Sequence, residues 1–499
     1  MNPCRCCQSS ECRTTFHRRG FLAGAMGAAV AAEAGLLDFA SSLFAADPKP
    51  AGKPLVRVVF LRSEVTPIVS WPGGNCDVPA QQALFTKTLQ DAAAQLGVQL
   101  DVRSQPINKR SEIATLLETL KQSPPAGLIV CAMELELWEL CNQIVRDKGN
   151  LPTVIYSHVS GFTSHLQCGR NTPYTYLGAT QDAGWLAFAL RMLHTIWRTK
   201  NTRILFVAGG DNRETTVAGV GTVFHWIPKA RFAEEFKKVA ATAEIRAAAA
   251  LVAKNAQKIV EPSEDDILQA VKNYVVCRRL MEAENCQGIA IDCLGWHDPV
   301  CLAFSKLRDE GIVAACEFDA NATIGMLLTH LLFQRPGFQQ DPSPNTVNNT
   351  LIGAHCTSPL RLEGFDKPYQ APYLLRSYHT RTGVAPEVLW PVDKPVTILH
   401  AEVAMEKPVS AAKAEAKGAK IFVGQGRVVA NIAQPPTGCC RTAVEIELDG
   451  VADTRDVKGF HQLFILGKHE RMFRAYGQLA GMAVAPIAGN AGSLSATPS

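Results

Sequence analysis

The stretch from Ile312 to His355 holds the residue types best suited to chemistry. Glu317 and Asp319 directly follow an apolar run, Asp341 comes after a predicted helix, and His355 ends the next apolar run. Because a strand–helix–loop excursion can return the chain to its starting level, Asp341 is expected beside Glu317, at the carboxyl edge of a sheet where ligands bind. Two carboxylates with one or two imidazoles suit Mn²⁺ or another divalent cation that keeps positions open for substrate oxygens.

Each of these side chains also has an ordinary structural interpretation. Glu317 or Asp319 at the end of a strand fits a helix cap or a surface ion pair. Asp341, beside a proline, fits a turn, and His355 fits a hydrogen-bonded, half-buried histidine. The metal prediction therefore depends on the whole set coming together.

The same region resembles the L-fucose isomerase / L-arabinose isomerase family in three motifs. Asp309–Asp319 matches a D-E-G segment that continues to C-E-x-D and enters a helix. Pro336–Asp341 matches P-x-F-x-x-D/E, and Gly459–His461 matches a late G-x-H strand that is followed by a helix. The resemblance extends from about Val56 to Ala485, and its motifs are specific as an ordered set.

By this resemblance, Glu317, Asp341 and His461 are metal ligands, and His355 is the additional ligand histidine of the arabinose-type members. The implied cofactor is Mn²⁺, and the implied reaction interconverts an aldose and a ketose through an enediolate. The metal would polarise the sugar carbonyl while Glu317 and Asp341 move the proton between C1 and C2. Asp319 is expected to contact substrate, orient a ligand or cap the helix. L-fucose and L-arabinose are the first candidate substrates, and relatives assemble as trimers or hexamers.

The chain departs from the family pattern beside the predicted ligands. Members often have Gly between the Glu and the Asp, where this chain has Phe318, and a Gly-Ala pair entering the helix, where it has Ala320–Ala322. Lys468 stands where relatives often carry Asp. Phe318 is expected to narrow the floor of the pocket and to alter substrate preference.

Three further residues are candidates for binding the sugar. Trp71 offers an aromatic platform, or else belongs to an ordinary turn. His297 follows a predicted strand and is expected to line the cleft, although the adjacent Asp298 also fits a helix N-cap. Arg376 lies in a polar cluster that suits sugar hydroxyls or a solvated loop.

Composition places the chain among ordinary globular proteins. Of its 499 residues, 47% are hydrophobic and 19% charged, and the net charge is +4. This weak charge, without a Lys/Arg run in the body of the chain, suggests neither nucleic acid nor an anionic membrane as a partner. The sixteen cysteines form no CxxC pair pattern in the body, so buried free thiols are expected there.

Residues 1–46 resemble a twin-arginine export signal. Arg18 and Arg19 precede an apolar stretch that is interrupted by Glu33, which makes it a poor membrane span. We expect a periplasmic protein with no membrane segment in its mature form. The alternative is a cytoplasmic protein that keeps this segment as a disordered tail.

Strand-like and helical patterns alternate from Leu55 to Phe333, and short strand-like runs between turns follow. This order predicts an α/β protein with two Rossmann-like domains built on parallel sheets, and then a β-rich, barrel-like domain. The expected segments are a signal (1–46), an N-terminal α/β domain (47–172), a second α/β domain (173–345), the β-rich domain (346–487) and a disordered tail (488–499).

One rival function remains open. Two tandem α/β domains behind an export signal also describe an exported sugar-binding protein or a non-catalytic relative of the isomerases. The β-rich domain that carries His461 favours the isomerase, because a binding protein does not need it. A metal-dependent hydrolase with the same ligands is a less favoured reading.

Overall fold

The computed structural model describes residues 52–64, 76–158, 165–294, 296, 299–406, 419–435 and 438–489. The expected export signal (1–46), most of the expected tail, Trp71 and His297 lie outside the described residues. Among the helices that the model does describe, none combines the length and the apolar character that crossing a bilayer requires.

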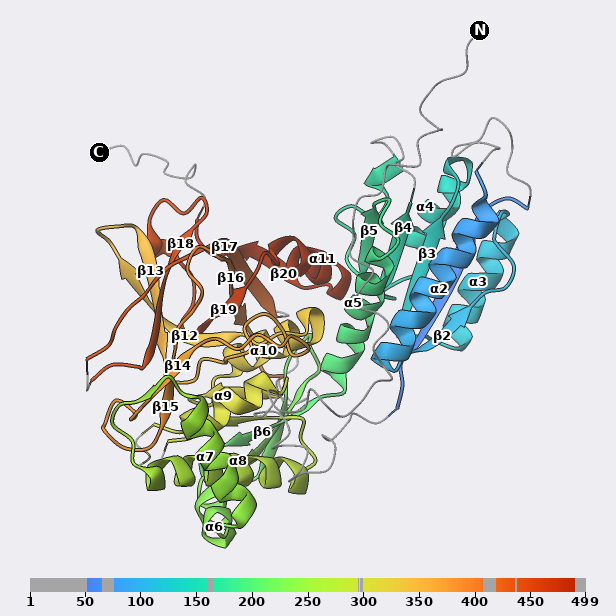
Figure 1. Cartoon of the computed structure of the whole chain (residues 1–499). Helices are drawn as coiled ribbons and strands as arrows, with labels where there is room; N and C mark the ends of the chain where they lie inside the picture. Colours follow the sequence, from blue (N-terminus) through green and yellow to red (C-terminus); the bar gives the residue numbers. More distant parts are fainter. Residues whose placement is uncertain are drawn as a thin grey trace, which may run out of the picture.

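The N-terminal part of the described chain folds around a parallel sheet in the order β2-β1-β3-β4-β5 (Figure 1). Alternate residues of β1 enter two separate cores, since Val58 packs with α2 and α5 whereas Val59 packs with α3 and α4. Helices therefore cover both faces, which explains why β3 and β4 are buried along their whole length. The elements are β1 (Leu55–Leu61), α2 (Val78–Leu96), β2 (Gln99–Val102), α3 (Arg110–Gln122), β3 (Gly127–Ala132), α4 (Trp138–Asp147), β4 (Thr153–Ser157), β5 (Thr175–Ala179) and α5 (Trp185–Lys200).

A second sheet follows in the order β11-β10-β6-β8-β7. Its first four strands are parallel and the edge strand β7 is antiparallel to β8. The strands are β6 (Arg203–Val207), β7 (Arg213–Thr216), β8 (Val223–Ile227), β10 (Gly288–Ile291) and β11 (Val313–Cys316). The helices are α6 (Ala230–Lys238), α7 (Ala243–Asn255), α8 (Glu264–Ala283), α9 (Cys301–Asp309) and α10 (Ala320–Phe333).

Two details of the α/β region differ from the sequence prediction. The strand Thr175–Ala179, where the second unit was expected to begin, pairs with β4 and is the last strand of the first sheet. The second sheet was expected to be parallel throughout, but Arg213–Thr216 forms a hairpin-like antiparallel edge. An antiparallel edge strand on an otherwise parallel sheet is common in mixed α/β proteins.

The C-terminal part contains a closed six-stranded barrel, as the β-rich prediction expected. Its strands run in the order β16-β19-β12-β13-β18-β17, and β17 pairs back with β16. β20 (Ala483–Pro486) adds to β17 on the outside of this circuit, and α11 (Glu470–Ala480) precedes it. The barrel strands are β12 (Phe338–Asn345), β13 (Thr350–His355), β16 (Pro395–Glu402), β17 (Lys420–Asn431), β18 (Thr442–Leu448) and β19 (Gln462–Leu466). A small separate sheet joins β9 (Lys258–Ile259), β14 (Tyr373–Arg376) and β15 (Ala385–Val388).

Helix α10 holds the second sheet against the barrel. One continuous core contains Ala315 of β11, Ile324 of α10 and Leu463 of β19. Gly325 of α10 allows a close approach, because a Cβ there would lie 2.9 Å from Leu463 Cδ1. The end of β11, where Glu317 lies, is therefore fixed relative to the barrel by packing on both sides of α10.

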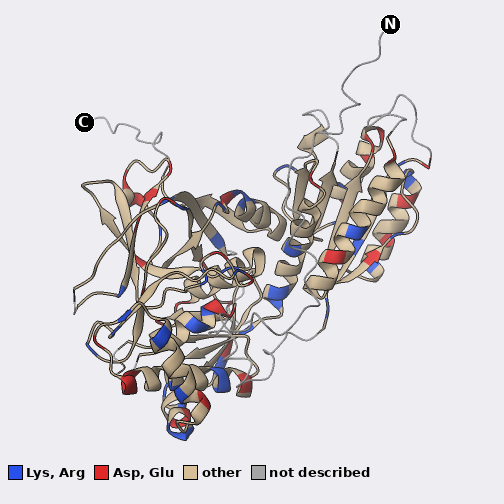
Figure 2. Cartoon of the chain, viewed as in Figure 1, with Lys and Arg blue, Asp and Glu red and all other residues tan. Residues whose placement is uncertain are grey.

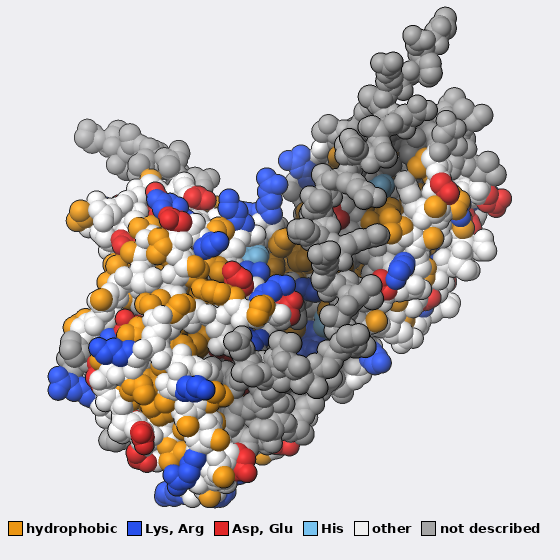
Figure 3. All heavy atoms as spheres, in the orientation of Figure 1, with side chains coloured by type: hydrophobic (Ala, Val, Ile, Leu, Met, Phe, Trp, Pro, Cys, Tyr) orange, Lys and Arg blue, Asp and Glu red, His pale blue; other side chains and the backbone are white. Residues whose placement is uncertain are grey.

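The surface carries charges of both signs. Figure 2 shows Lys and Arg interspersed with Asp and Glu over the helices of both lobes. Figure 3 shows a notch between the lobe of the first sheet and the lobe of the barrel. The view in Figure 3 shows no dominant patch of one charge on this face.

Candidate metal centre

The register of the barrel brings two distant histidines to one aspartate. On one side of β12, Asp341 lies opposite Ala354 of β13, and on the other side Gln340 lies opposite Gln462 of β19. When each antiparallel register is extended by one residue, His355 of β13 lies opposite Gln340, and His461, just before β19, lies opposite Asp341. The central strand β12 therefore carries an aspartate between two imidazoles.

Glu317 reaches the same place from the second sheet. It directly follows β11, and its carboxylate lies 3.7 Å from His355 Nε2 and 3.4 Å from His461 Nε2. His461 Nε2 also lies 3.1 Å from Asp341 Oδ1. Glu317, His355 and His461 each offer one ligand atom, and these atoms all lie within 4.8 Å of one another, so this cluster could hold a metal ion.

The facing atoms are buried and contact one another at ion-pair distance. Asp341 Oδ1, His355 Nε2 and His461 Nε2 make no well-formed hydrogen bond within the described residues, although His461 Nε2 lies 3.1 Å from Asp341 Oδ1. Buried polar atoms are rarely left unpaired, because each unmade hydrogen bond costs about 1–3 kcal/mol. A cation held by Glu317, His355 and His461 would engage both imidazole nitrogens, and a donor set of carboxylate and imidazole fits a divalent metal.

The other ring nitrogen of each histidine is held by a neighbour. Asp319 Oδ2 lies 3.0 Å from His461 Nδ1, and Thr357 Oγ1 lies 3.3 Å from His355 Nδ1. These contacts orient both rings so that Nε2 faces the cluster, as in metal sites where a carboxylate or hydroxyl fixes the ligand imidazole.

Asp319 has a second task at the start of α10. Its Oδ1 accepts a hydrogen bond of 2.6 Å from the backbone N–H of Ala322 and caps the helix. Both carboxylate oxygens are thus used within the protein. These contacts match the orienting and capping roles that the sequence suggested, and a direct substrate contact stays a prediction.

The backbone at the cluster adopts conformations that side chains disfavour. Glu317, Phe318 and His461 have φ values of 58°, 45° and 51°. Such left-handed conformations cost free energy for residues other than glycine, and they concentrate at functional sites. The tight turn after β11 directs Glu317 toward the barrel, and the turn before β19 does the same for His461.

The charges of the cluster are strongly coupled. Contacts with His355 and His461 hold the pKa of Glu317 well below its usual range. Burial alone would lower the pKa of His355, but Cys316 and Glu317 raise it to about 10. Burial likewise opposes the charged form of His461, but Asp319, Asp341 and Glu317 raise its pKa to about 11. In the metal-free protein, protons therefore occupy nitrogens that a cation would need.

A buried glutamine connects the barrel to the turn that carries Glu317, and the sequence prediction missed it. Gln339 of β12 accepts a hydrogen bond of 2.9 Å from the Cys316 N–H and donates one of 3.2 Å to the Cys316 carbonyl. The buried guanidinium of Arg308 also donates to Gln339 Oε1, at 3.2 Å. Nothing in the local sequence distinguishes Gln339 from a polar turn residue, because its partners lie far away along the chain.

Arg376 is engaged elsewhere. Its guanidinium donates to Glu261 at 2.8–3.0 Å and also pairs with Glu387, and the side chain is 9% exposed. These bonds join β14, β15 and the segment after β9. Arg376 therefore has a structural role in the small sheet, whereas Trp71 and His297 remain sequence predictions.

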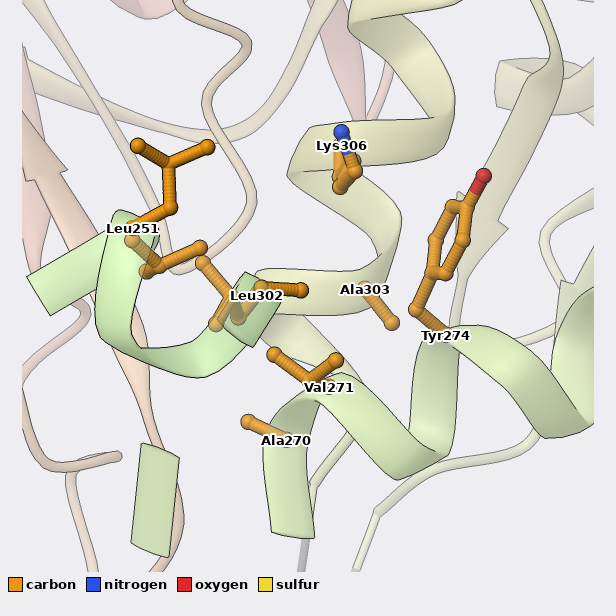
Figure 4. A pocket seen from close by; sticks show the side chains of 9 residues that line it. Leu251, Ala270, Val271, Tyr274, Leu302, Ala303 and Lys306 are labelled. Atoms are coloured by element: carbon orange, nitrogen blue, oxygen red, sulfur yellow. The ribbon is translucent and has the colours of Figure 1, made fainter. Parts of the chain in front are cut away.

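A small crevice among the helices that cover the second sheet is separate from the cluster. It lies between α7, α8 and α9, and its lining is mostly apolar, with Lys306 and Tyr274 at one end (Figure 4). Its volume of about 10 Å³ holds at most a single water molecule. None of the candidate ligands lines it, so this crevice is a packing defect between helices.

Comparison with known proteins does not identify the chain. No family model and no curated protein matches it. Among solved structures it is similar to GanP, a glucose-galactose binding protein from Geobacillus stearothermophilus, at 14% identity over 56% of this chain and 92% of that chain. The TM-score is 0.17, which is too low for the similarity to bear on fold or function. The geometry of the cluster itself therefore has to support any functional conclusion.

Proposed function

We propose that this protein is a metal-dependent aldose–ketose isomerase of the L-fucose/L-arabinose isomerase type, with two Rossmann-like domains before the barrel. The observation that carries the proposal is the cluster of Glu317, His355 and His461, with Asp341 Oδ1 3.1 Å from His461 Nε2. The motif resemblance named these four residues as ligands, although they are spread over more than a hundred positions of the chain.

The cofactor that suits this donor set best is Mn²⁺. The carboxylate of Glu317 and the two imidazoles, with the Asp341 carboxylate beside His461, combine hard oxygen ligands with borderline nitrogen ligands, which Mn²⁺ accepts. When bound, such a cation would polarise the sugar carbonyl and stabilise the charge of the enediolate.

The carboxylates of the cluster supply the proton transfer. Isomerisation removes the proton on C2 of the aldose and returns one to C1, while the hydroxyl proton moves from O2 to O1. Glu317 is held ionised by two imidazoles, and Asp341 Oδ1 lies 3.1 Å from His461 Nε2. Carboxylates placed on either side of the C1–C2 bond act as base and then as acid.

The surrounding residues keep this machinery in place. Asp319 holds the His461 ring, and Gln339 fixes the turn that presents Glu317. As further parts of the proposal, the substrate is a free sugar such as L-fucose or L-arabinose. The protein is a homo-oligomer, and it is exported to the periplasm.

The test is ketose formation by the full chain. The protein is stripped of metal with a chelator, reloaded with Mn²⁺ and incubated with a panel of pentoses and 6-deoxyhexoses. We expect Mn²⁺-dependent ketose formation that Glu317→Gln and Asp341→Asn reduce at least 100-fold. Asp91→Asn, which removes a carboxylate from an exposed ion pair on α2, serves as the control and leaves activity unchanged. Binding of Mn²⁺ without turnover of any sugar would refute the isomerase and favour a non-catalytic binding protein.

A further inference from the structure

A hollow much larger than the crevice of Figure 4 lies beside α6 and α8. Its walls come from these two helices and from Trp296 in the loop after β10, and its volume is about 520 Å³. Pockets that hold small ligands enclose roughly 300–1,000 Å³. Figure 1 shows α6 against α8 at the end of this lobe. None of the candidate metal ligands lines the hollow, so it is a separate place on the chain.

The topology of the second sheet favours a ligand at this edge. β6, β8 and β10 are parallel, so their carboxyl ends lie along one edge. From β6 the chain first reaches β8 on one side and later β10 on the other. Open α/β sheets bind ligands at such a switch point, outside the carboxyl ends of the strands. Lys229, which follows β8 and lines the hollow, meets Asp292, which follows β10, with Nζ 3.0 Å from Oδ2.

Aromatic rings form much of the wall. The rings of Phe232 and Trp296 pack with centroids 4.8 Å apart and planes inclined by 52°. Phe232 is buried, whereas Phe236 and Trp296 are only partly buried against the core. Ring surface that stays in water is apolar area that a bound molecule would cover, which favours binding.

Two lysines beside these rings lack a carboxylate partner within the described residues. Lys237 lines the hollow and is exposed. Lys272 Nζ lies 4.3 Å from the centre of the Phe236 ring. By contrast, Lys238 on the same helix as Lys237 is paired with Glu235 at 3.1 Å. The hollow therefore combines apolar walls with positive charge that an anion would complement.

We propose that this hollow is a second ligand site, which binds a small amphipathic carboxylate, that is, one carboxylate on a phenyl or short alkyl body. The body covers the rings of Phe236 and Trp296, and the carboxylate lies beside the ammonium groups of Lys237 and Lys272. These charges compensate the carboxylate for the water that it loses. A neutral molecule of the same shape lacks this contribution. The site does not depend on the isomerase reaction, because it shares no residue with the cluster.

Two probes of nearly the same shape test the charge. 4-Phenylbutyrate carries a carboxylate where 4-phenylbutyramide carries a neutral amide. Titration calorimetry with the full chain at low ionic strength should show the carboxylate binding at least fivefold more tightly than the amide. This ratio should shrink in about 0.5 M NaCl, because salt screens charges near the surface. Equal affinities at low ionic strength, or no binding of 4-phenylbutyrate at millimolar concentration, would overturn the proposal.

Matched variants locate the site. Lys237→Gln and Lys272→Gln should each reduce the carboxylate-to-amide ratio at least twofold. Lys238→Gln removes a charge that is already paired with Glu235 and should leave the ratio unchanged. Trp296→Ala should weaken both probes at least fivefold, whereas Trp296→Phe, which keeps an aromatic ring, should retain most of the binding.

Melting temperature and light scattering accompany each titration. The lysine variants keep the test decisive where Trp296→Ala fails to fold, because they change side chains that reach solvent. A ratio that Lys238→Gln lowers as much as Lys237→Gln does would contradict the assigned site. Loss of self-association in Trp296→Ala, together with no probe binding by the wild type, would assign the hollow to an interface between copies of the chain and overturn the ligand site.

Discussion

Replacing Asp319 offers the sharpest test of how the cluster is built, because this carboxylate performs two separable tasks. Oδ1 caps α10 through the Ala322 N–H at 2.6 Å, and Oδ2 orients His461 at 3.0 Å. Asp319→Asn keeps an oxygen for the cap but removes the charge that faces the imidazole. Asp319→Ala removes both contacts.

The expected magnitudes differ for the two tasks. Loss of a partner that orients a ligand histidine weakens metal binding by roughly 10–100-fold, which corresponds to about 1.4–2.7 kcal/mol. Loss of an N-cap costs about 1 kcal/mol of folding free energy. Asp319→Asn should therefore weaken Mn²⁺ binding with little loss of stability, whereas Asp319→Ala should show both losses.

Calorimetric Mn²⁺ titration and urea unfolding of the metal-free protein measure the two quantities separately. On a His461→Ala background, Asp319→Asn should have no further effect on Mn²⁺ affinity, because the ring it orients is gone. Unchanged Mn²⁺ affinity in Asp319→Asn, or full additivity with His461→Ala, would refute the orienting role.

Three further predictions concern the surroundings of the cluster. Gln339→Leu should destabilise the protein by about 2–4 kcal/mol in urea unfolding, since it leaves backbone groups at the end of β11 and a buried guanidinium short of partners; wild-type stability would contradict this. Gly459→Ala should lower the melting temperature and the Mn²⁺ affinity, because its Cβ would lie 2.2 Å from a histidine ring of β16. Gly450 has a similar positive φ but open space around it, so Gly450→Ala should lower the melting temperature much less. Equal effects of the two substitutions would assign the loss to backbone strain alone. The pKa values of His355 and His461 are raised to about 10 and 11, so their contribution to the stability of the metal-free protein is fully present below pH 6.5 and is lost as the pH rises through those values. Between pH 6.5 and 10.5, the melting temperature of a variant with both histidines changed to Gln should therefore fall less steeply than that of the wild type.

Much of the architecture followed from local patterns where local and tertiary preferences agree. Helix α11 spans Glu470–Ala480 and follows the late strand, as the motif resemblance predicted. Helix α8 begins after Ser263, whose side chain accepts the Asp266 N–H in a capping box. In both elements the residues that define the ends are neighbours along the chain, so the sequence contains the whole signal.

Strand β12 was not foreseen as a strand because it contains Pro342 and Pro344. Its pairing explains how the prolines are tolerated. Residues 338–340 pair with β19, whereas residues 341–345 pair only with β13. Prolines lack the backbone N–H for a ladder and are confined to edges, which is the condition of the second half of this strand. Asp341 lies where the strand changes from central to edge, so it was interpreted as a turn residue when taken alone.

The residues of the candidate cluster could be named from motifs, but the residues that support them could not. Glu317, Asp341, His355 and His461 are recognisable by type and by order along the chain. Gln339 and the double role of Asp319 became visible only through contacts between the second sheet and the barrel. Long-range contacts of this kind leave no periodicity or spacing in the sequence.

The division of the ligands between two layers has a physical consequence for the fold. Glu317 belongs to the second sheet, whereas the other three ligands belong to the barrel. Three features meet at the junction of the two layers. The backbone is left-handed at Glu317 and His461, the facing ligand atoms make no well-formed hydrogen bond within the described residues, and the imidazole pKa values are raised. A cation bound by both layers would neutralise the facing carboxylate and replace the protons on the imidazoles. Because such binding would favour only the assembled state, it would stabilise the junction by mass action.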